Sequence, residues 1–232
     1  MSLFVRTTFG SLRLLTPPGV YAPRSDTALL ASEIGAVHHA EVLELCTGSG
    51  AVALMAAKRG ARRVVAVDLS RRAMVSVRVN ARLNRSRIDA RRGDLFAVAR
   101  AEERFDVVLA NPPYLPAADD QAGDDRWDAG PDGRLILDRI IDGVRDALKP
   151  AGRLVLVQSA LASIDATRER LSRNGFEVIR CIEHVGPLGP IAMARRENLM
   201  RIGAIDRGSR LETLVAFTAR PTSSSIPRQV RV

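Results

Sequence analysis

Short apolar runs typical of strands alternate with helix-like stretches through most of this chain, and this alternation constrains the fold more than any other feature. The expected strands are residues 42–46, 64–68, 88–92, 105–110, 154–158, 176–183 and 212–219. The expected helices are residues 25–34, 51–59, 73–81, 137–148 and 164–171. Such alternation predicts an α/β fold with a doubly wound, seven-stranded, mostly parallel sheet. The last two strands lack a clear helix between them, so we expect a closing antiparallel pair.

The composition is that of a folded chain. Of the 232 residues, 46% are hydrophobic, which excludes wholesale disorder. The apolar stretches are far shorter than the roughly 18 residues that a membrane span needs. Arg13 interrupts the apolar stretch near the N-terminus, and no small-residue cleavage site follows, so we expect no secretory signal. Cys46 and Cys181 are too few for a disulfide framework or a four-thiolate zinc site. We expect a cytoplasmic protein without a metal or a membrane partner.

The expected domain boundaries lie where the chain is rich in Pro, Gly and Ser. Residues 1–24 are interpreted as an N-terminal extension, 25–220 as the α/β domain and 221–232 as a mobile tail. Segment 185–210 is long for a connection between two strands, and such loops usually carry function or lack fixed structure. The acidic segment 119–128 is either a mobile lid or a solvated charged loop.

Positive charge exceeds negative charge in this chain. The 35 basic residues outnumber the 26 acidic ones, giving a net charge of +9, and only Lys58 and Lys149 are lysines. A basic surface favours acidic partners such as RNA or ribosomal particles. Use of arginine for lysine in a GC-rich genome explains the same composition, so both interpretations stay open.

A glycine-containing loop follows the first strand of the predicted sheet. Gly48 and Gly50 allow the backbone to turn sharply and to approach a ligand closely. Asp68 ends the next strand, where a carboxylate can accept hydrogen bonds from both hydroxyls of a ribose. The pattern indicates a nucleoside-containing cofactor, either a nicotinamide dinucleotide or S-adenosylmethionine.

Two further residues favour S-adenosylmethionine. Ala53 occupies the place of the third glycine of a dinucleotide fingerprint. Glu44 precedes the loop, where a carboxylate suits an ammonium and a sulfonium but would repel a pyrophosphate. Asp94 follows the third strand and could accept from the adenine amine, with Leu95 packing against the ring.

The segment Asn111-Pro112-Pro113-Tyr114 directly follows the strand at 105–110 and predicts the chemistry. A planar NH2 group is a poor nucleophile because its lone pair is delocalised. The Asn111 side-chain carbonyl and the Pro112 backbone carbonyl could each accept one N–H and so aim the nitrogen at a methyl group. Pro113 helps to fix that carbonyl, because two successive prolines restrict the backbone. Tyr114 could pack flat on the acceptor plane.

At this point the chain resembles the HemK family of S-adenosylmethionine-dependent class I methyltransferases, which act on glutamines of peptide-chain release factors. The resemblance covers about residues 18–183, and it is carried by residues 20–23, 26–27, 44–50, 68, 93–96, 111–114, 127–134 and 137–139. It implies transfer of a methyl group to a glutamine side-chain amide. The candidate cofactor-binding residues are Tyr21, Thr27, Glu44, Cys46, Thr47, Gly48, Gly50, Asp68, Leu69, Asp94, Leu95 and Asn111. The candidate catalytic and substrate-binding residues are Asn111, Pro112, Pro113 and Tyr114.

The sequence departs from the family pattern in three ways. Cys46 stands where the family usually has glycine, the usual N-terminal helical domain is not expected, and segment 185–210 is not a family feature. The chain is more similar to the short archaeal and eukaryotic branch, which works with a small activator protein.

The expected partner is a protein substrate such as a release factor. Methylation of an exocyclic amine of DNA or RNA is the closest alternative. A nicotinamide-dependent oxidoreductase and a partner that only binds are weaker ones.

Overall fold

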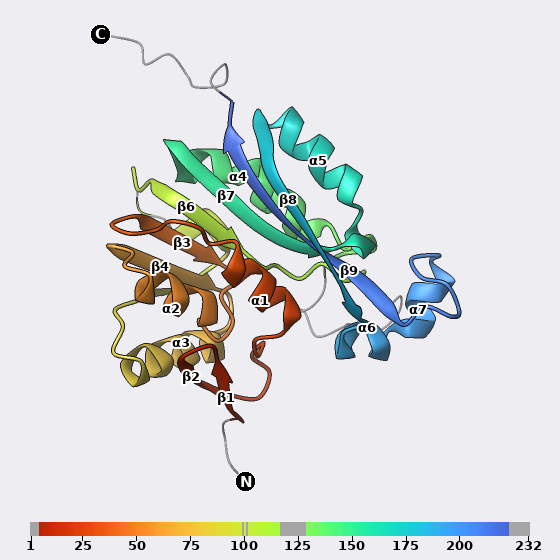
Figure 1. Ribbon diagram of the computed structural model, residues 1–232, viewed down its shortest axis with the longest axis horizontal. Coiled ribbons are helices and arrows are strands. Elements are labelled where there is room, and N and C mark those ends of the chain that lie inside the picture. Colours follow the sequence, from red (N-terminus) through yellow and green to blue (C-terminus); the bar gives the residue numbers. More distant parts are fainter. Residues whose placement is uncertain (1–4, 99, 101, 117–128, 223–232) are drawn as a thin grey trace.

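The computed structural model describes residues 5–98, 100, 102–116 and 129–222. Its centre is a seven-stranded sheet in the order β5-β4-β3-β6-β7-β9-β8 (Figure 1). The strands are β3 (Glu41–Leu45), β4 (Arg63–Asp68), β5 (Asp89–Arg92), β6 (Phe105–Ala110), β7 (Leu148–Ser159), β8 (Phe176–Pro187) and β9 (Leu211–Pro221). Strand β9 runs antiparallel to both β7 and β8 and lies between them. The predicted doubly wound, mostly parallel sheet with an antiparallel closing pair is confirmed.

Helices cover both faces of this sheet (Figure 1). One face carries α1 (Ser25–Ser32), α2 (Ala51–Lys58) and α3 (Arg71–Leu83), and the other carries α4 (Leu135–Ala147) and α5 (Ile164–Arg173). Alternate residues of β6 point toward opposite faces of the sheet. Val107 packs in the core beneath α1, α2 and α3, and Val108 packs in the core beneath α4 and α5. Because the strand is buried on both faces, its sequence is apolar except for Asp106 near its amino end.

The N-terminal segment contains a β-hairpin that the sequence pattern does not predict. Strands β1 (Val5–Phe9) and β2 (Leu12–Thr16) pair antiparallel, and Leu12 and Leu14 pack against α2 and α3. Asn80 on α3 holds the hairpin: its side-chain oxygen accepts from the Leu15 amide at 2.8 Å. These contacts join parts of the chain about 65 residues apart, so a local pattern cannot reveal them. The domain boundary at residue 25 stays a prediction.

Several predicted boundaries need correction. Helix α1 begins after Arg24, its N-cap residue, and ends at Ser32, two residues before the expected end at 34. Strand β7 begins at Leu148, directly after α4, and not at residue 154 as expected. Segment 185–210 is not a plain loop: β8 extends into it as far as Pro187, and two short helices, α6 (Pro190–Ala194) and α7 (Arg196–Arg201), lie between β8 and β9.

Some expectations concern residues outside the described part of the chain. They are the lid at 119–128, Trp127 and Asp128 of the family-like segment, and most of the tail, 223–232. None of the helices in the described ranges combines the length and apolar character that crossing a membrane requires. Within the same ranges, no group of three or more His, Cys, Asp or Glu side chains is arranged to hold a metal.

Candidate active site

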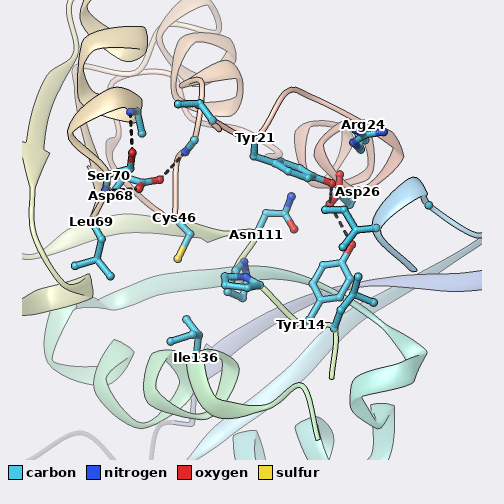
Figure 2. A pocket seen from close by; sticks show the side chains of 18 of the residues that line it. Tyr21, Arg24, Asp26, Cys46, Asp68, Leu69, Ser70, Asn111, Tyr114 and Ile136 are labelled. Carbon is cyan, nitrogen blue, oxygen red and sulfur yellow. Dashed lines mark hydrogen bonds between the residues drawn. The ribbon is translucent and has the colours of Figure 1, made fainter. Parts of the chain in front are cut away.

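A cavity of about 370 Å³ opens where the carboxyl ends of β3, β4, β5 and β6 meet. This is the edge at which ligands bind in open α/β sheets. Figure 2 shows side chains that line it. Its lining from the sheet edge comprises Cys46, Gly48, Asp68, Leu69, Ser70, Gly93, Asp94, Leu95 and residues 111–115. Residues 19–21 and 24–26, which precede and begin α1, form a second wall, and residues 189–192 with Glu212 form a third.

The loop after β3 turns through left-handed backbone conformations. Gly48 has a φ of 53°, and a Cβ atom there would lie 3.2 Å from the Tyr21 carbonyl oxygen. Glycine is therefore needed for both the turn and the close packing. Cys46 also has a positive φ, of 55°, which explains why glycine is the usual residue at this place in the resembled family. Burial raises the pKa of the Cys46 thiol, so it lines the cavity as a small neutral side chain.

Glu44 binds the loop rather than lining the cavity. Its carboxylate accepts from the Thr47 hydroxyl at 2.5 Å and from the Ala53 amide at 2.8 Å. The side chain is only 3% exposed, and burial raises its pKa to about 8. Gly50 begins α2 in a left-handed conformation. Neither Glu44 nor Thr47 nor Gly50 is among the described residues that line the cavity.

Asp68 lies at the end of β4 with both carboxylate oxygens facing backbone donors. One oxygen accepts from the Gly48 amide at 2.9 Å and the other from the Ser70 amide at 2.9 Å (Figure 2). Burial raises the pKa of Asp68, and these two hydrogen bonds oppose the rise. A carboxylate oxygen has lone pairs for more than one donor, so Asp68 fits the two hydroxyls of a ribose. Leu69 beside it is 61% exposed at the cavity rim.

Asp94 and Leu95 follow β5, next to the end of β4, since the Gly93 amide donates to the Asp68 backbone oxygen at 3.1 Å. The Asp94 carboxylate forms an ion pair with Arg139 of α4 at 2.6 Å, with both side chains partly exposed. Leu95 is buried, with a φ of 45°. The carboxylate and the apolar side chain fit the edge and the face of an adenine.

Asn111 follows β6 and lies near the centre of the cavity, between Cys46 and Tyr21 (Figure 2). Its side-chain oxygen is buried, and no described residue donates a hydrogen bond to it. A buried acceptor without a partner costs free energy, about 1–3 kcal/mol, unless a ligand satisfies it. Pro112 and Pro113 line the same cavity. The arrangement leaves an acceptor ready for an N–H group.

Asp26 links two tyrosines of the cavity, and the sequence analysis did not single it out as a site residue. One of its carboxylate oxygens accepts from the Tyr21 hydroxyl at 2.7 Å and from the Tyr114 hydroxyl at 3.0 Å (Figure 2). Burial and this carboxylate raise the pKa of both tyrosines, so both remain protonated donors. The other oxygen accepts from the amide and the hydroxyl of Thr27, which does not line the cavity. The family-like segment 26–27 was the available signal for this role.

The third wall comes from the segment expected as a loop. The Gly189 amide donates to the Glu212 carboxylate at 3.0 Å, and burial raises the pKa of Glu212. Ala192 of α6 and Leu199 of α7 form a buried apolar cluster with Leu115 and with Leu188, which precedes α6. No local pattern marks these residues as part of a site, because only the fold brings β8 and β9 to the cavity.

A doubly wound sheet, a glycine loop, strand-end carboxylates and an asparagine oxygen that no described residue pairs together define a class I methyltransferase. The model of the methyltransferase small domain family matches residues 11–180, and the chain belongs to that family. It is an S-adenosylmethionine-dependent methyltransferase, which confirms the predicted enzyme class and cofactor.

The relatives by sequence include glutamine methyltransferases. A putative protein N5-glutamine methyltransferase of Methanocaldococcus jannaschii is 37% identical over 171 residues, covering 72% of this chain and 86% of that protein. A release factor glutamine methyltransferase of Geobacter sulfurreducens is 31% identical over 180 residues, covering 72% of this chain and 63% of that protein. The resemblance to this group is confirmed.

Solved structures share the fold. The E. cuniculi Mtq2–Trm112 complex, responsible for methylation of the eRF1 translation termination factor, matches with a TM-score of 0.60 and 25% identity, covering 88% of this chain and 99% of that chain. A 16S rRNA N2 G1207 methyltransferase of T. thermophilus, in complex with AdoMet and guanosine, matches with a TM-score of 0.62 and 19% identity, covering 94% of this chain and 51% of that chain. The second likeness concerns the fold alone.

Proposed function

We propose that this protein transfers a methyl group from S-adenosylmethionine to the side-chain amide nitrogen of a glutamine in a protein, and that the protein is a peptide-chain release factor. The buried side-chain oxygen of Asn111, which has no hydrogen-bond donor in the described part of the chain, carries the proposal. It lies at the cavity, beyond the end of β6, where an acceptor nitrogen would meet a cofactor held by the glycine loop. The relatives named above supply the substrate class.

The physical problem is the weak nucleophilicity of an amide. Its nitrogen lone pair is delocalised into the carbonyl, and no general base at neutral pH removes an amide proton easily. Two fixed acceptors solve this by holding both N–H groups, one on Asn111 Oδ1 and one on the Pro112 carbonyl. The lone pair then points toward the methyl group, and the acceptors stabilise the positive charge that develops on nitrogen. Pro113 restricts Pro112, which keeps its carbonyl in place.

The cofactor would lie across the carboxyl ends of β3, β4 and β5. When bound, S-adenosylmethionine supplies an electrophilic methyl group on its sulfonium. Asp68 would accept from the ribose hydroxyls, Asp94 from the adenine amine, and Leu95 would pack on the ring. Gly48 would let the backbone approach the cofactor, and Tyr21 and Cys46 would pack beside Asn111. Glu44 would act by holding the loop through Thr47 and Ala53.

The acceptor would enter between Tyr114 and the wall formed by residues 189–192. The Tyr114 hydroxyl is engaged by Asp26, so its ring is fixed in orientation and can pack against a planar amide. We propose further that the protein works in the cytoplasm and that a small activator protein accompanies it, as Trm112 accompanies Mtq2 in the E. cuniculi complex.

The decisive experiment uses the purified full chain, a radiolabelled methyl donor and a purified release factor from the same cells. We expect label in the protein, resistant to nuclease and lost with protease, with mass spectrometry placing one methyl group on a glutamine side chain. A lysate of the same cells serves as the source of an activator if the two purified proteins alone react slowly. Label found in RNA or DNA, with none in protein, would instead establish the nucleobase alternative.

A further inference from the structure

The excess positive charge of this protein is concentrated in one part of the chain. Residues 58–104 hold 14 of the 35 basic residues and only five of the 26 acidic ones. The remainder of the chain has 21 of each, so this one stretch accounts for the whole net charge of +9. An arginine-rich composition alone would spread the excess along the chain. The clustering therefore points to a function for this surface.

Helix α3 presents a stripe of arginines to solvent. Arg71, Arg78 and Arg82 on the helix are exposed, and their spacing of seven and four residues puts them on one face. Arg85, just after the end of the helix, is exposed as well. The helix contains no acidic residue. At 1.5 Å per residue, the stripe from Arg71 to Arg82 is about 17 Å long. The helix lies at the opposite end of the sheet from α6 and α7 (Figure 1).

A groove continues this stripe at the C-terminal end of α3. Its lining includes Arg62, Arg63, Arg78, Arg82 and Arg87, with Asp89 at the start of β5. It lies at the amino ends of β4 and β5, whereas the candidate active site lies at the carboxyl ends of these strands. A ligand in the groove is therefore separate from the reacting groups.

The acidic residues near the groove are already paired. Asp89 contacts Arg63 at 3.7 Å and Arg91 at 2.7 Å, and Glu103 pairs with Arg91 at 2.6 Å. Among the described residues, neither Arg82 nor Arg87 has an acidic partner. These two guanidinium groups are free to bind an external anion.

We propose that the α3 stripe and its groove form a docking surface for the sugar–phosphate backbone of a nucleic acid. The planar guanidinium of arginine binds phosphate oxygens in pairs. Neither the helix nor the groove lining contains an aromatic side chain for base stacking, which favours a duplex backbone over a splayed single strand. Val75 is the one large exposed apolar residue of α3, too little for the apolar centre of a protein interface.

The test measures binding by fluorescence anisotropy with labelled duplex RNA and duplex DNA of about 20 base pairs over a series of salt concentrations. The variant is Arg82→Gln/Arg87→Gln. Its control, Arg173→Gln/Arg207→Gln, removes the same charge from exposed residues elsewhere in the fold. We expect the first variant to bind about tenfold more weakly, with the slope of log K against log salt reduced by about 2, and the control to bind like the natural chain.

Comparison of the affinities for duplex RNA and for duplex DNA shows which of the two nucleic acids this surface binds more tightly. Equal weakening by the control, or the absence of salt-dependent binding in the natural chain, would overturn the proposal. Displacement of the duplex by poly-glutamate at the same charge concentration would point to an acidic protein instead. Methyl transfer to a release factor is expected to be unchanged in both variants. The result of the binding experiment therefore does not depend on which substrate the enzyme methylates.

Discussion

The hydroxyl of Tyr114 donates to the carboxylate of Asp26 at 3.0 Å, across 88 residues of sequence. The same oxygen accepts from Tyr21 at 2.7 Å. One buried carboxylate at the start of α1 therefore fixes both the end of the Asn111–Tyr114 segment and an aromatic wall of the cavity. In the proposed mechanism the orientation of the reacting amide would depend on this contact, although Asp26 itself would touch neither reactant.

We expect Asp26→Asn to lower kcat by about tenfold and to change the affinity for S-adenosylhomocysteine much less. The amide offers one neutral oxygen to two hydroxyls that now share a charged acceptor, so the Tyr114 ring becomes less well fixed. Tyr114→Phe should have a similar effect, and the double variant should lose little more than either single one, because both remove the same contact. Additive losses in steady-state kinetics would contradict the coupling.

Asn111→Ala is expected to lower kcat by about 100- to 1,000-fold, since it removes one of two acceptors for the reacting nitrogen. The affinity for S-adenosylhomocysteine, measured by calorimetry, should stay within a few-fold because Asp68 and the glycine loop are intact. Near-normal turnover on the true substrate would rule out the two-acceptor mechanism.

Substitution of Asp68 should have the reverse effect. Asp68→Ala removes the acceptor for the ribose and also releases the Gly48 and Ser70 amides. We expect cofactor binding to weaken by about 100-fold, and to weaken less in Asp68→Asn, which keeps one acceptor. The measurement is calorimetric titration with S-adenosylhomocysteine. An unchanged dissociation constant would show that the ribose binds elsewhere.

The buried carboxyl of Glu44 predicts a pH dependence of stability. Its pKa is raised from 4.5 to about 8 in the folded protein, so between these values the folded state holds more protons than the unfolded state. Its contribution to the free energy of unfolding therefore falls as the pH rises through this window, by up to about 1.4 kcal/mol per pH unit.

Glu44→Gln removes this titration and keeps an oxygen that can accept from Thr47 and Ala53. The variant should be more stable than the natural chain at about pH 9 and have a flatter pH profile in denaturant unfolding. Glu177→Gln on β8, at an exposed position, is the control and should leave the profile as it is. A parallel profile for Glu44→Gln and the natural chain would show that Glu44 does not titrate in this range.

Gly133 packs against the backbone of Tyr114. A Cβ atom at Gly133 would lie 2.3 Å from the Tyr114 carbonyl oxygen, and its φ is 76°. Gly133→Ala should therefore lower both Tm and kcat, because the Asn111–Tyr114 segment must shift. Gly203→Ala is matched in φ, at 71°, but meets no atom within 4 Å. It should cost only about 1 kcal/mol of backbone strain and spare kcat. Equal kcat in the two variants would contradict the role of this contact.

The amino-acid sequence determined the parts of this protein that depend on local order. Apolar periodicity fixes the strands and helices, since an apolar run such as 105–110 is stable only between two helical layers. The carboxyl ends of parallel strands lie at one edge of the sheet. The motifs at 46–50, 68, 94–95 and 111–114 follow such strands, so they must lie close together at that edge. Most of the candidate site followed from these two rules.

The tertiary structure alone decided which groups face one another. It directs the Glu44 side chain toward the loop that follows β3, and it brings Asp26 into contact with Tyr114. It also places the hairpin of β1 and β2 on α3 and residues 189–192 at the cavity. It also gathered arginines of α3 and of the chain beside it into one groove. These contacts join residues that are far apart in the chain, and their free energy comes from burial and from hydrogen bonds between specific partners. A pattern within one segment carries no record of them.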